Sequence, residues 1–439
     1  MEKRIRIKET QDRLITPSGL LLVGALLLNT IIGRRLNRLV KPRDVKHQNA
    51  SCVIPMIGLL CQGKTEYEDI REMQKDPSFH CQALRINTIP SEETVRQRLD
   101  HLGLEIASSD MVMEESVKML KSVGAEPTPC FTGHIPLDID VSPHDNSNTK
   151  KEGVSWTYKG MDGYAPMYAY IGQEGYACNG ELREGSCHSQ CDGTVDFLED
   201  TLRLAKQITP EKLLVRMDSG NDSLDNIKLF IKEKVDYIIK RNLRKESKDE
   251  WLKMAEMHGI KSTPRSGKTV YTGEVMCIKH DPQPLRVVFE VTERTVTANG
   301  QMLILPEIDV ETWWTSLENP PEDVIQLYHE HATCEQFHSE IKSDIGLERF
   351  PSGKFDTNAA ILKLALLAFN ILRIIGQSSL KTDEKVTRKN VKRLRAKTVI
   401  QRFMTMAGRV IEHARQTFMT FGRSNIWSRT FTKLYEAFG

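Results

Sequence analysis

Four residues near the carboxyl end of the chain have types and spacings that suit work on a phosphate and a metal ion. Tyr328, Glu335 and Lys342 follow one another at intervals of seven residues, and His331 lies four residues before Glu335. Steps of four and seven return to one face of a helix with about 3.6 residues per turn. That face would present a ring, an imidazole, a carboxylate and an ammonium group. A metal-binding carboxylate beside a phosphate-binding lysine suits phosphoryl-transfer chemistry on DNA.

Two aspartates far upstream could complete a metal site with Glu335. Asp140 lies near the end of Ile135–Val141, where apolar residues alternate with others as in a strand, and Asp218 follows the short apolar run Leu213–Met217. Three carboxylates around two divalent ions can activate water and hold the leaving oxygen of a phosphodiester. Mg²⁺ prefers such oxygen ligands. An aspartate that ends a strand is also a common turn or cap residue, so spacing alone leaves both interpretations open.

The elements that must position these acids alternate between strands and helices. Apolar residues recur at intervals of two in the strands and at helical intervals between them. Acidic residues end the first and fourth strands. The order predicts an α/β fold. In chain order we expect strands at Ile135–Val141, Ala165–Ile171 and Tyr176–Leu182, a helix at Thr194–Gln207, a strand at Leu213–Met217, a helix at Ser223–Lys234 and a strand at Val235–Lys240.

The region before this core, residues 1–125, has helical patterns. Pro90 is a stop signal, and Ser91 is a candidate N-cap for a helix that contains Arg96 and Arg98. The two arginines could touch DNA as in a helix-turn-helix motif, or they could face solvent on a helical bundle. The pattern does not choose between these interpretations.

The region after the core begins with a predicted β-rich insertion. Residues 243–310 contain the β-branched stretches Thr269–Ile278 and Leu285–Thr297. Trp313 and Trp314 follow; they could stack on an unpaired base, but burial is the favoured interpretation because tryptophan is usually buried. A helical pattern resumes at Pro321, continues in an apolar helix at Asn358–Gln377, and closes the chain with a basic segment and a last helical region.

Composition indicates a soluble globular protein with material for two to four domains. The chain has 439 residues, of which 39% are hydrophobic and 27% charged. The apolar run Gly19–Gly33 is shorter than the roughly 17–25 residues of a membrane span, so we expect a buried helix. The nine cysteines are scattered, and the cluster Cys187, His188 and Cys191 lacks the close ligand pairs of a zinc site. We therefore expect reduced thiols.

Positive charge is concentrated in two segments. The net charge of the chain is +2, but residues 1–46 hold eleven basic and four acidic residues, and residues 381–399 hold eight and two. Basic arms on an acidic centre suit a polyanionic partner. Taken alone, such charge runs are more often solvated faces.

Longer strings around the candidate acids resemble a known family. They are LDIDVSPHDN at 137–146, KKEGVSWTYKGMDGYAP at 150–166, LVRMDSGNDS at 214–223 and EQFHSEIKSDIGLERFPSGKF at 335–355. The chain resembles DDE transposases of bacterial insertion sequences over nearly its whole length. It is most similar to the thirteen-eighty insertion-sequence family, within the superfamily marked by Tyr-x2-Arg-x3-Glu-x6-Lys.

Carried over by position, the resemblance implies catalytic, metal-binding acids at Asp140, Asp218 and Glu335. Asp138 shares a strand face with Asp140, so periodicity does not choose between them. The sequence Asp140-Val141-Ser142 fits the Asp-x-Thr/Ser pattern of the family and favours Asp140. The implied cofactor is Mg²⁺ or Mn²⁺, as two ions.

The resemblance also implies residues that grip DNA. Tyr328 and Lys342 match the flanking pair of the signature, and Arg349 lies just past it, where it would contact a phosphate or pair with a surface acid. The signature arginine is His331 here, which lacks the fixed fork of a guanidinium and is partly charged at neutral pH. Arg96 and Arg98 are the candidates in the amino-terminal region.

The implied architecture is a ribonuclease-H-like catalytic core with a β-rich insertion, preceded by a helical DNA-binding region. We expect the following parts: a helical DNA-binding region at 1–130, the first part of the core at 131–242, the insertion at 243–315, the rest of the core with the glutamate helix at 316–380, and a basic helical region at 381–439.

The implied activity is cleavage at the ends of an insertion sequence and joining of the freed 3′-hydroxyl to target DNA. The expected partners are the element ends, the target DNA and a second copy of the chain, with no membrane and no small-molecule substrate. The expected location is the bacterial cytoplasm, at the nucleoid. Two alternatives remain: a metal-dependent nuclease that does not join strands, and a degenerate protein that only binds DNA, for which His331 is the single hint.

Overall fold

The computed structural model describes residues 5, 7–40, 46–187, 189–277, 284–382 and 391–439. These residues form two compact units. The helical unit comprises Met1–Ala125, Glu340–Pro351 and Leu364–Gly439, and the sheet unit comprises Glu126–Ser339 and Ser352–Lys363. Each unit therefore combines segments that are far apart in the sequence.

A nine-stranded sheet organises the sheet unit, with the strand order β10-β11-β12-β13-β9-β8-β2-β6-β7. A second, three-stranded sheet has the order β3-β5-β4. The strands are β2 (Ile135–Val141), β3 (His144–Asp145), β4 (Ser155–Trp156), β5 (Asp162–Tyr164), β6 (Met167–Ile171), β7 (Tyr176–Glu181), β8 (Leu213–Met217), β9 (Asp236–Lys240), β10 (Ile260–Arg265), β11 (Lys268–Cys277), β12 (Leu285–Val296) and β13 (Met302–Thr315).

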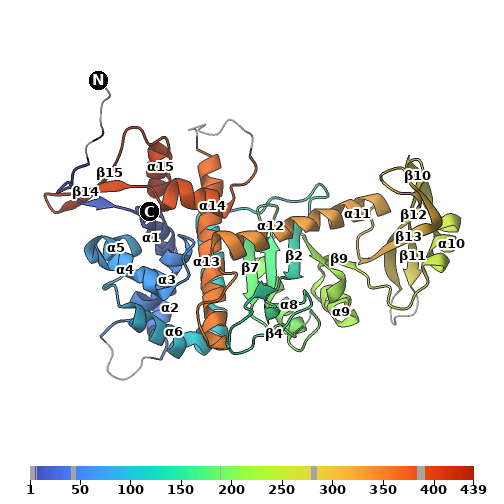
Figure 1. Cartoon of the computed structure of the whole chain (residues 1–439), viewed down its shortest axis with the longest axis horizontal. Helices are drawn as coiled ribbons and strands as arrows, with labels where there is room; N and C mark the ends of the chain where they lie inside the picture. The colour runs from blue at the N-terminus through green and yellow to red at the C-terminus, as the bar shows by residue number, and fades with distance from the viewer. Residues whose placement is uncertain (1–4, 6, 41–45, 188, 278–283, 383–390) are drawn as a thin grey trace. The chain divides into compact units, whose positions relative to one another are not determined.

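Five of these strands, β7-β6-β2-β8-β9, form the core that the sequence predicts. The central strand β2 is antiparallel to β6 and parallel to β8, and β8 is parallel to β9. Parallel neighbours need crossover helices, which α8 and α9 provide; in Figure 1 they lie on the opposite side of these strands from α11 and α12. This mixed sheet with its crossovers is an α/β fold with a ribonuclease-H-like core.

The helices of the sheet unit surround this core. They are α8 (Thr194–Ile208), α9 (Leu224–Glu233), α10 (Lys248–His258), α11 (Pro321–Glu330) and α12 (Cys334–Ser339), with 3-10 turns at Ser219–Asn221 and His331–Thr333. In α8 and α9 the apolar residues follow helical spacing on one face, which packs each helix onto the sheet.

The predicted β-rich insertion differs from the structure in two ways. Its long strands extend the core sheet, because the end of β13 pairs with β9 over Trp313–Thr315. It also contains a helix that the sequence reading missed, α10, which lies beside these strands in Figure 1. That helix has only one buried residue, Ala255, so its apolar signal is weak. The predicted strand end at Ile278 lies outside the described residues.

The helical unit contains α1 (Leu20–Leu28), which includes much of the apolar run Gly19–Gly33 and is almost wholly buried. It also contains a small sheet of order β1-β14-β15. The other elements are α2 (Ile32–Arg38), α3 (Asn49–Leu60), a 3-10 turn (Tyr67–Asp69), α4 (Ile70–Gln74), α5 (Pro77–Leu84), α6 (Glu92–Ala107), α7 (Met111–Ser122), a π-helix (Glu340–Asp344), α14 (Ala396–Val399), a π-helix (Ile400–Met404) and α15 (Ser428–Phe438), with strands β1 (Leu14–Ile15), β14 (Gly408–His413) and β15 (Gln416–Phe421).

The carboxyl-terminal region is not wholly helical, which corrects the prediction for residues 381–439. Strands β14 and β15 form a hairpin, and β14 also pairs with β1 near the amino terminus. Sequence periodicity missed the hairpin because one of its faces is mostly exposed and polar residues interrupt the alternation. Parts of both basic arms, including 41–45 and 383–390, lie outside the described residues.

The long helix α13 (Phe355–Leu380) begins in the sheet unit and continues in the helical unit. Among the described residues it is the single helix long and apolar enough to cross a membrane, and α1 with α2 passes the same test as a bent pair. The apolar window of α13 is 94% buried. Core helices have this composition when protein surrounds them, so its burial favours a core role.

Candidate active site

The strand register brings the two predicted aspartates together. Strands β2 and β8 are parallel, and Ile139 lies opposite Met217. The next residue on each strand is Asp140 and Asp218, so the two carboxylates leave the sheet at the same end of neighbouring strands. Neighbouring strands lie about 4.8 Å apart, which places both side chains within reach of common ligands.

The pKa of Asp218 is affected by the neighbouring Asp140. Burial and the charge of Asp140 raise the pKa of Asp218 above its ordinary value, although a hydrogen bond of 2.7 Å from Asn221 to its Oδ1 opposes the shift. Two adjacent carboxylates destabilise each other's charged form unless a cation lies between them. The pair therefore has negative charge that a metal ion would neutralise.

Asp140 is held by partners from the late helical segment. Burial raises its pKa, but the hydrogen bond and charge of His338 outweigh burial and hold the pKa below the ordinary value. The distance from His338 Nε2 to Asp140 Oδ2 is 3.3 Å, and from Cys334 Sγ to the same oxygen 3.9 Å. On its other side, Asp140 Oδ1 accepts a hydrogen bond of 2.8 Å from the Val141 amide. Asp140 is therefore ionised and oriented at neutral pH.

Asp138, the competing candidate on the same strand face, is engaged elsewhere. Its carboxylate receives two hydrogen bonds from Arg216, at 2.7 and 2.8 Å, and lies 2.8 Å from His331 Nδ1. All three side chains are buried. Burial raises the pKa of Asp138, but Arg216 and His331 outweigh it and the pKa is lowered. Asp138 therefore belongs to a buried ion-pair cluster, whereas Asp140 faces the other acids.

His331 takes part in this cluster and is only 6% exposed. The prediction that it grips a phosphate assumed a side chain on the helix surface. In the structure its Nδ1 bonds to Asp138, so its position is that of a positioning residue. His331 stands where the family signature has arginine. Because this side chain is buried against Asp138, the difference in residue type affects the packing around β2.

The predicted helix that carries Glu335 is not uniform. It consists of α11, a 3-10 turn at His331–Thr333, α12 and a π-helix at Glu340–Asp344. The 3-10 turn is overwound and the π-helix underwound relative to an α-helix, so steps of four and seven do not keep one face. Glu335 is exposed, while Cys334 beside it is buried and faces Asp140.

Tyr158, which was not predicted as a site residue, lies near all three acids. Its hydroxyl donates a hydrogen bond of 3.0 Å to the carbonyl of Val141. Burial of the hydroxyl, followed by the charges of Asp140, Asp218 and Glu335, raises the pKa of Tyr158. All three carboxylates therefore lie near enough to the Tyr158 hydroxyl to influence its pKa. Its position in the string at 150–166 was the signal that could have identified it.

The acids fit divalent metal ions by their chemistry. Asp140 and Asp218 offer carboxylate oxygens at one end of the sheet, and Glu335 adds a third, exposed carboxylate. Mg²⁺ takes oxygen ligands and keeps several waters, so the site needs few protein ligands. Among the described residues, the three side chains with ligand atoms within 4.8 Å of one another are Asp140, Cys334 and His338. The oxygen donors therefore fit Mg²⁺, and a nitrogen and a sulfur donor lie beside them.

Tyr328 lies close to the acids within the sheet unit. Its ring packs against Trp313, with centroids 5.6 Å apart, and against His331 at 5.9 Å. Burial and the charges of Asp218 and Asp140 raise its pKa. Trp313 and Trp314 are 0% and 3% exposed, so the core interpretation of both tryptophans is confirmed.

The other predicted DNA-contact residues lie in the helical unit. Lys342 is in the π-helix, and Arg349 is exposed after it. Arg96 is on the surface of α6 and pairs with Glu93 and Asp100. Arg98 is 4% exposed and donates to Asn49 and to the carbonyl of His47. A DNA contact by Arg98 does not fit this burial, because its guanidinium serves the core of the unit.

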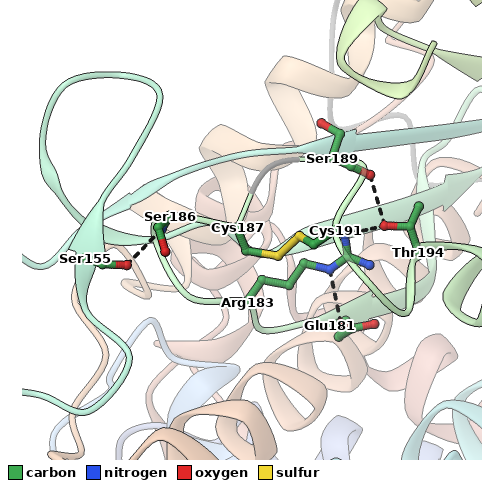
Figure 2. The surroundings of a disulfide bond; sticks show 8 residues. All are labelled: Ser155, Glu181, Arg183, Ser186, Cys187, Ser189, Cys191 and Thr194. Atoms are coloured by element: carbon green, nitrogen blue, oxygen red, sulfur yellow. Dashed lines mark hydrogen bonds and ion pairs between the residues drawn. A yellow bond between two sulfur atoms is a disulfide. The ribbon is translucent and has the colours of Figure 1, made fainter. Parts of the chain in front are cut away.

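The cysteine cluster forms a disulfide. Cys187 and Cys191 are joined, with Cα atoms 5.9 Å apart, as Figure 2 shows. The loop between β7 and α8 folds back and brings the two Cα atoms within the range a disulfide requires. The expectation of reduced thiols is therefore wrong for this pair, and a zinc site on both thiolates is excluded with it. His188 lies outside the described residues.

This disulfide loop lies against the turn that carries Asp218. Ser189, which Figure 2 shows between the two cysteines in the loop, has its Oγ 2.7 Å from where a Cβ on Gly220 would stand. Gln190 also donates a hydrogen bond of 2.9 Å to the carbonyl of Asp222. A side chain at position 220 would require the Ser189 hydroxyl to move, so glycine there allows this close approach.

The chain has a ribonuclease-H-like core with aspartates at the ends of β2 and β8, and comparisons with known proteins identify its family. The family model described as "Transposase DDE domain group 1" matches residues 1–438, so the chain belongs to this family. No curated protein matches the sequence. Among solved structures, the chain is similar to a piggyBac transposase synaptic complex with hairpin DNA, determined by cryo-EM, with 10% identity, a TM-score of 0.41, and coverage of 88% of this chain and 78% of that one.

Proposed function

We propose that this protein is an active transposase of a bacterial insertion sequence, of the thirteen-eighty family, which cuts DNA at the element ends and joins the 3′-hydroxyl to target DNA. The observation that carries the proposal is the pairing of Asp140 and Asp218 at the ends of parallel strands, with a raised pKa at Asp218. Two adjacent buried carboxylates destabilise the folded protein when no cation lies between them. Groups with such unfavourable environments are concentrated at functional sites.

In this proposal Asp140, Asp218 and Glu335 hold two Mg²⁺ or Mn²⁺ ions. The bound ions would activate the attacking oxygen and stabilise the leaving oxygen of the phosphodiester. His338 orients the Asp140 carboxylate through the hydrogen bond at 3.3 Å. Arg216 and His331 act as positioning residues, since they fix Asp138 and thereby the strand that carries Asp140.

The DNA contacts are assigned to residues at the edge of the site and on the helical unit. Tyr328 presents its ring beside the acids. Lys342, Arg349 and Arg96 supply positive charge to the phosphate backbone, which dominates affinity for DNA. Two element ends must be held together for joining, so we propose a homodimer in the DNA complex. The protein would then act at the nucleoid in the bacterial cytoplasm.

A strand-transfer assay tests this function against the nuclease alternative. The substrate is a pre-cut duplex that ends in the sequence flanking the gene, with a free 3′-hydroxyl, mixed with a plasmid target and Mg²⁺. The proposal expects joined products that Asp218→Asn abolishes and that the surface variant Glu322→Gln retains. Cutting of intact ends without any joining would assign the protein to the nucleases. Binding without cutting or joining would assign it to proteins that only occupy their DNA sites.

A further inference from the structure

Three side chains of different chemistry converge on one side of the site. Asp140 Oδ2 lies 3.3 Å from His338 Nε2 and 3.9 Å from Cys334 Sγ, and all three ligand atoms are within 4.8 Å of one another. Cys334 and His338 are each 2% exposed, while the Asp140 side chain is 14% exposed. The three donors are therefore mostly buried, and the carboxylate is the most exposed of them.

Two of the three separations between the donor atoms are close to the edges of a metal tetrahedron. With metal–nitrogen and metal–oxygen bonds of about 2.0–2.1 Å and a metal–sulfur bond of about 2.3 Å, tetrahedral geometry puts nitrogen about 3.4 Å from oxygen and sulfur about 3.6 Å from oxygen. The observed values are 3.3 and 3.9 Å. Cys334 Sγ would have to move a few tenths of an ångström toward the carboxylate to reach that edge, and Sγ and Nε2 lie within 4.8 Å of each other. The edges of a Mg²⁺ octahedron are shorter, at about 2.9 Å from bonds of 2.0–2.1 Å.

The histidine is already oriented as a ligand. His338 Nδ1 lies 3.2 Å from the Tyr170 hydroxyl, and Nε2 faces Asp140. A ligating histidine commonly has its second nitrogen fixed by such a partner. Tyr170 is itself buried on the central sheet, at 1% exposed. The ring therefore has little freedom to turn Nε2 away from the proposed ion.

We propose that Asp140, Cys334 and His338 form a separate site for a thiophilic transition ion such as Zn²⁺. Thiolate and imidazole donors select Zn²⁺ over Mg²⁺, which prefers oxygen alone. Three protein ligands leave one coordination position open to water or to a phosphate oxygen. The site shares Asp140 with the three-acid centre, so Zn²⁺ held here withdraws one carboxylate oxygen from that centre.

The test of the site uses Co²⁺ as a spectroscopic substitute for Zn²⁺, in the full-length protein with its disulfide intact. A thiolate ligand gives a charge-transfer band in the near ultraviolet, and tetrahedral coordination gives intense visible bands. We expect both in the wild type, with displacement by Zn²⁺ but not by excess Mg²⁺. The charge-transfer band should disappear in Cys334→Ser and persist in Cys81→Ser, which removes a thiol of the helical unit.

Two further variants separate a metal site from a histidine that only orients Asp140. Tyr170→Phe removes the partner of His338 Nδ1 and should weaken Co²⁺ binding about 10-fold or more, as outer partners of metal ligands do. Asp218→Asn should leave the charge-transfer band in place, since Asp218 is not a ligand of this site. Absence of the band in the wild type, or its persistence in Cys334→Ser, would overturn the proposal.

The functional consequence rests on the proposed transposase activity. Micromolar Zn²⁺ should inhibit Mg²⁺-dependent cleavage by the wild type at least about 10-fold more strongly than cleavage by Cys334→Ser, with each rate normalised to that protein in Mg²⁺ alone. Equal inhibition of both proteins would contradict the coupling. A protein that shows the Co²⁺ bands but never cuts DNA would retain the metal site while refuting the proposed function.

Discussion

Replacing Arg216 with methionine should destabilise the sheet unit more than any surface substitution. The guanidinium is 4% exposed. It donates to both oxygens of Asp138 on β2, and a further hydrogen bond of 2.7 Å goes to the carbonyl of Leu327 on α11. One side chain thus connects the strand of Asp140 with the helix that precedes Glu335. Its loss leaves a buried carboxylate whose remaining side-chain hydrogen-bond partner shown here is His331.

The expected cost is about 3–5 kcal/mol, the range for a buried ion pair that loses one partner. For a unit of this size, each kcal/mol lowers the melting temperature by about 2–4 °C, so the fall should be about 6–20 °C. The direction in which the stability difference changes with pH follows from the pKa of Asp138. The lowered pKa of Asp138 stabilises the wild type above its ordinary value of 3.8. In the variant burial raises that pKa, so the difference between the proteins should shrink as the pH falls toward 4.

Differential scanning calorimetry at pH 7 and pH 4.5 measures this difference. Arg96→Met is the matched control, because Arg96 pairs with Glu93 and Asp100 on the surface, where solvent screens the charges, and it should leave the melting temperature nearly unchanged. The double variant Asp138→Leu/Arg216→Met should recover part of the loss, since it leaves no buried charge unpaired. A change in Arg216→Met no larger than in Arg96→Met would refute the reasoning.

Two further predictions concern the acid pair and the disulfide. Asp218→Asn should raise the melting temperature of the metal-free protein at pH 7, because it removes a carboxylate whose charge is disfavoured by burial and by Asp140. These two causes raise the pKa of Asp218, so the gain should appear only as the pH rises above about 3.8. A fall in melting temperature at pH 7 would count against the pairing of the two acids. Cys187→Ser should cost about 2 kcal/mol in urea unfolding, from the chain-entropy estimate for a loop closed over four residues. A dithiol reductant should abolish its difference from the wild type, and a difference that survives reduction would show that the bond is not its source.

The core of the fold was predictable because its signals are local. The strands at Ile135–Val141 and Leu213–Met217 have the predicted bounds, and the helix predicted at Thr194–Gln207 ends one residue later. The first strand alternates with a period of two, the second is a short continuous apolar run, and the helix has helical spacing of its apolar residues. The prediction was wrong where the apolar pattern is weak. A helical region was predicted over Gly408–His413 and Gln416–Phe421, but these segments form a β-hairpin with one face mostly exposed.

The site was only partly predictable because its discriminating contacts are long-range. Asp138 and Asp140 are equivalent by strand periodicity, and only Arg216, 78 residues from Asp138, shows which one is engaged in the core. The same is true of His331. Its spacing predicts a phosphate contact on the helix surface, whereas in the structure its side chain is bonded to Asp138. The division of the late helix into α, 3-10 and π segments was likewise not predicted, because the sequence carries no periodic signal for it.

The most direct test of the central claim is a cleavage assay in Mg²⁺ on DNA that carries the sequences flanking the gene. Wild type, Glu335→Gln and Glu322→Gln are compared, because both substitutions remove one exposed carboxylate from the same helical region. We expect the wild type and Glu322→Gln to cut at the element end. Glu335→Gln should cut at least about 100-fold more slowly, because it removes a ligand of the catalytic metal ions. Equal cutting by all three proteins would show that Glu335 does not hold a catalytic metal ion.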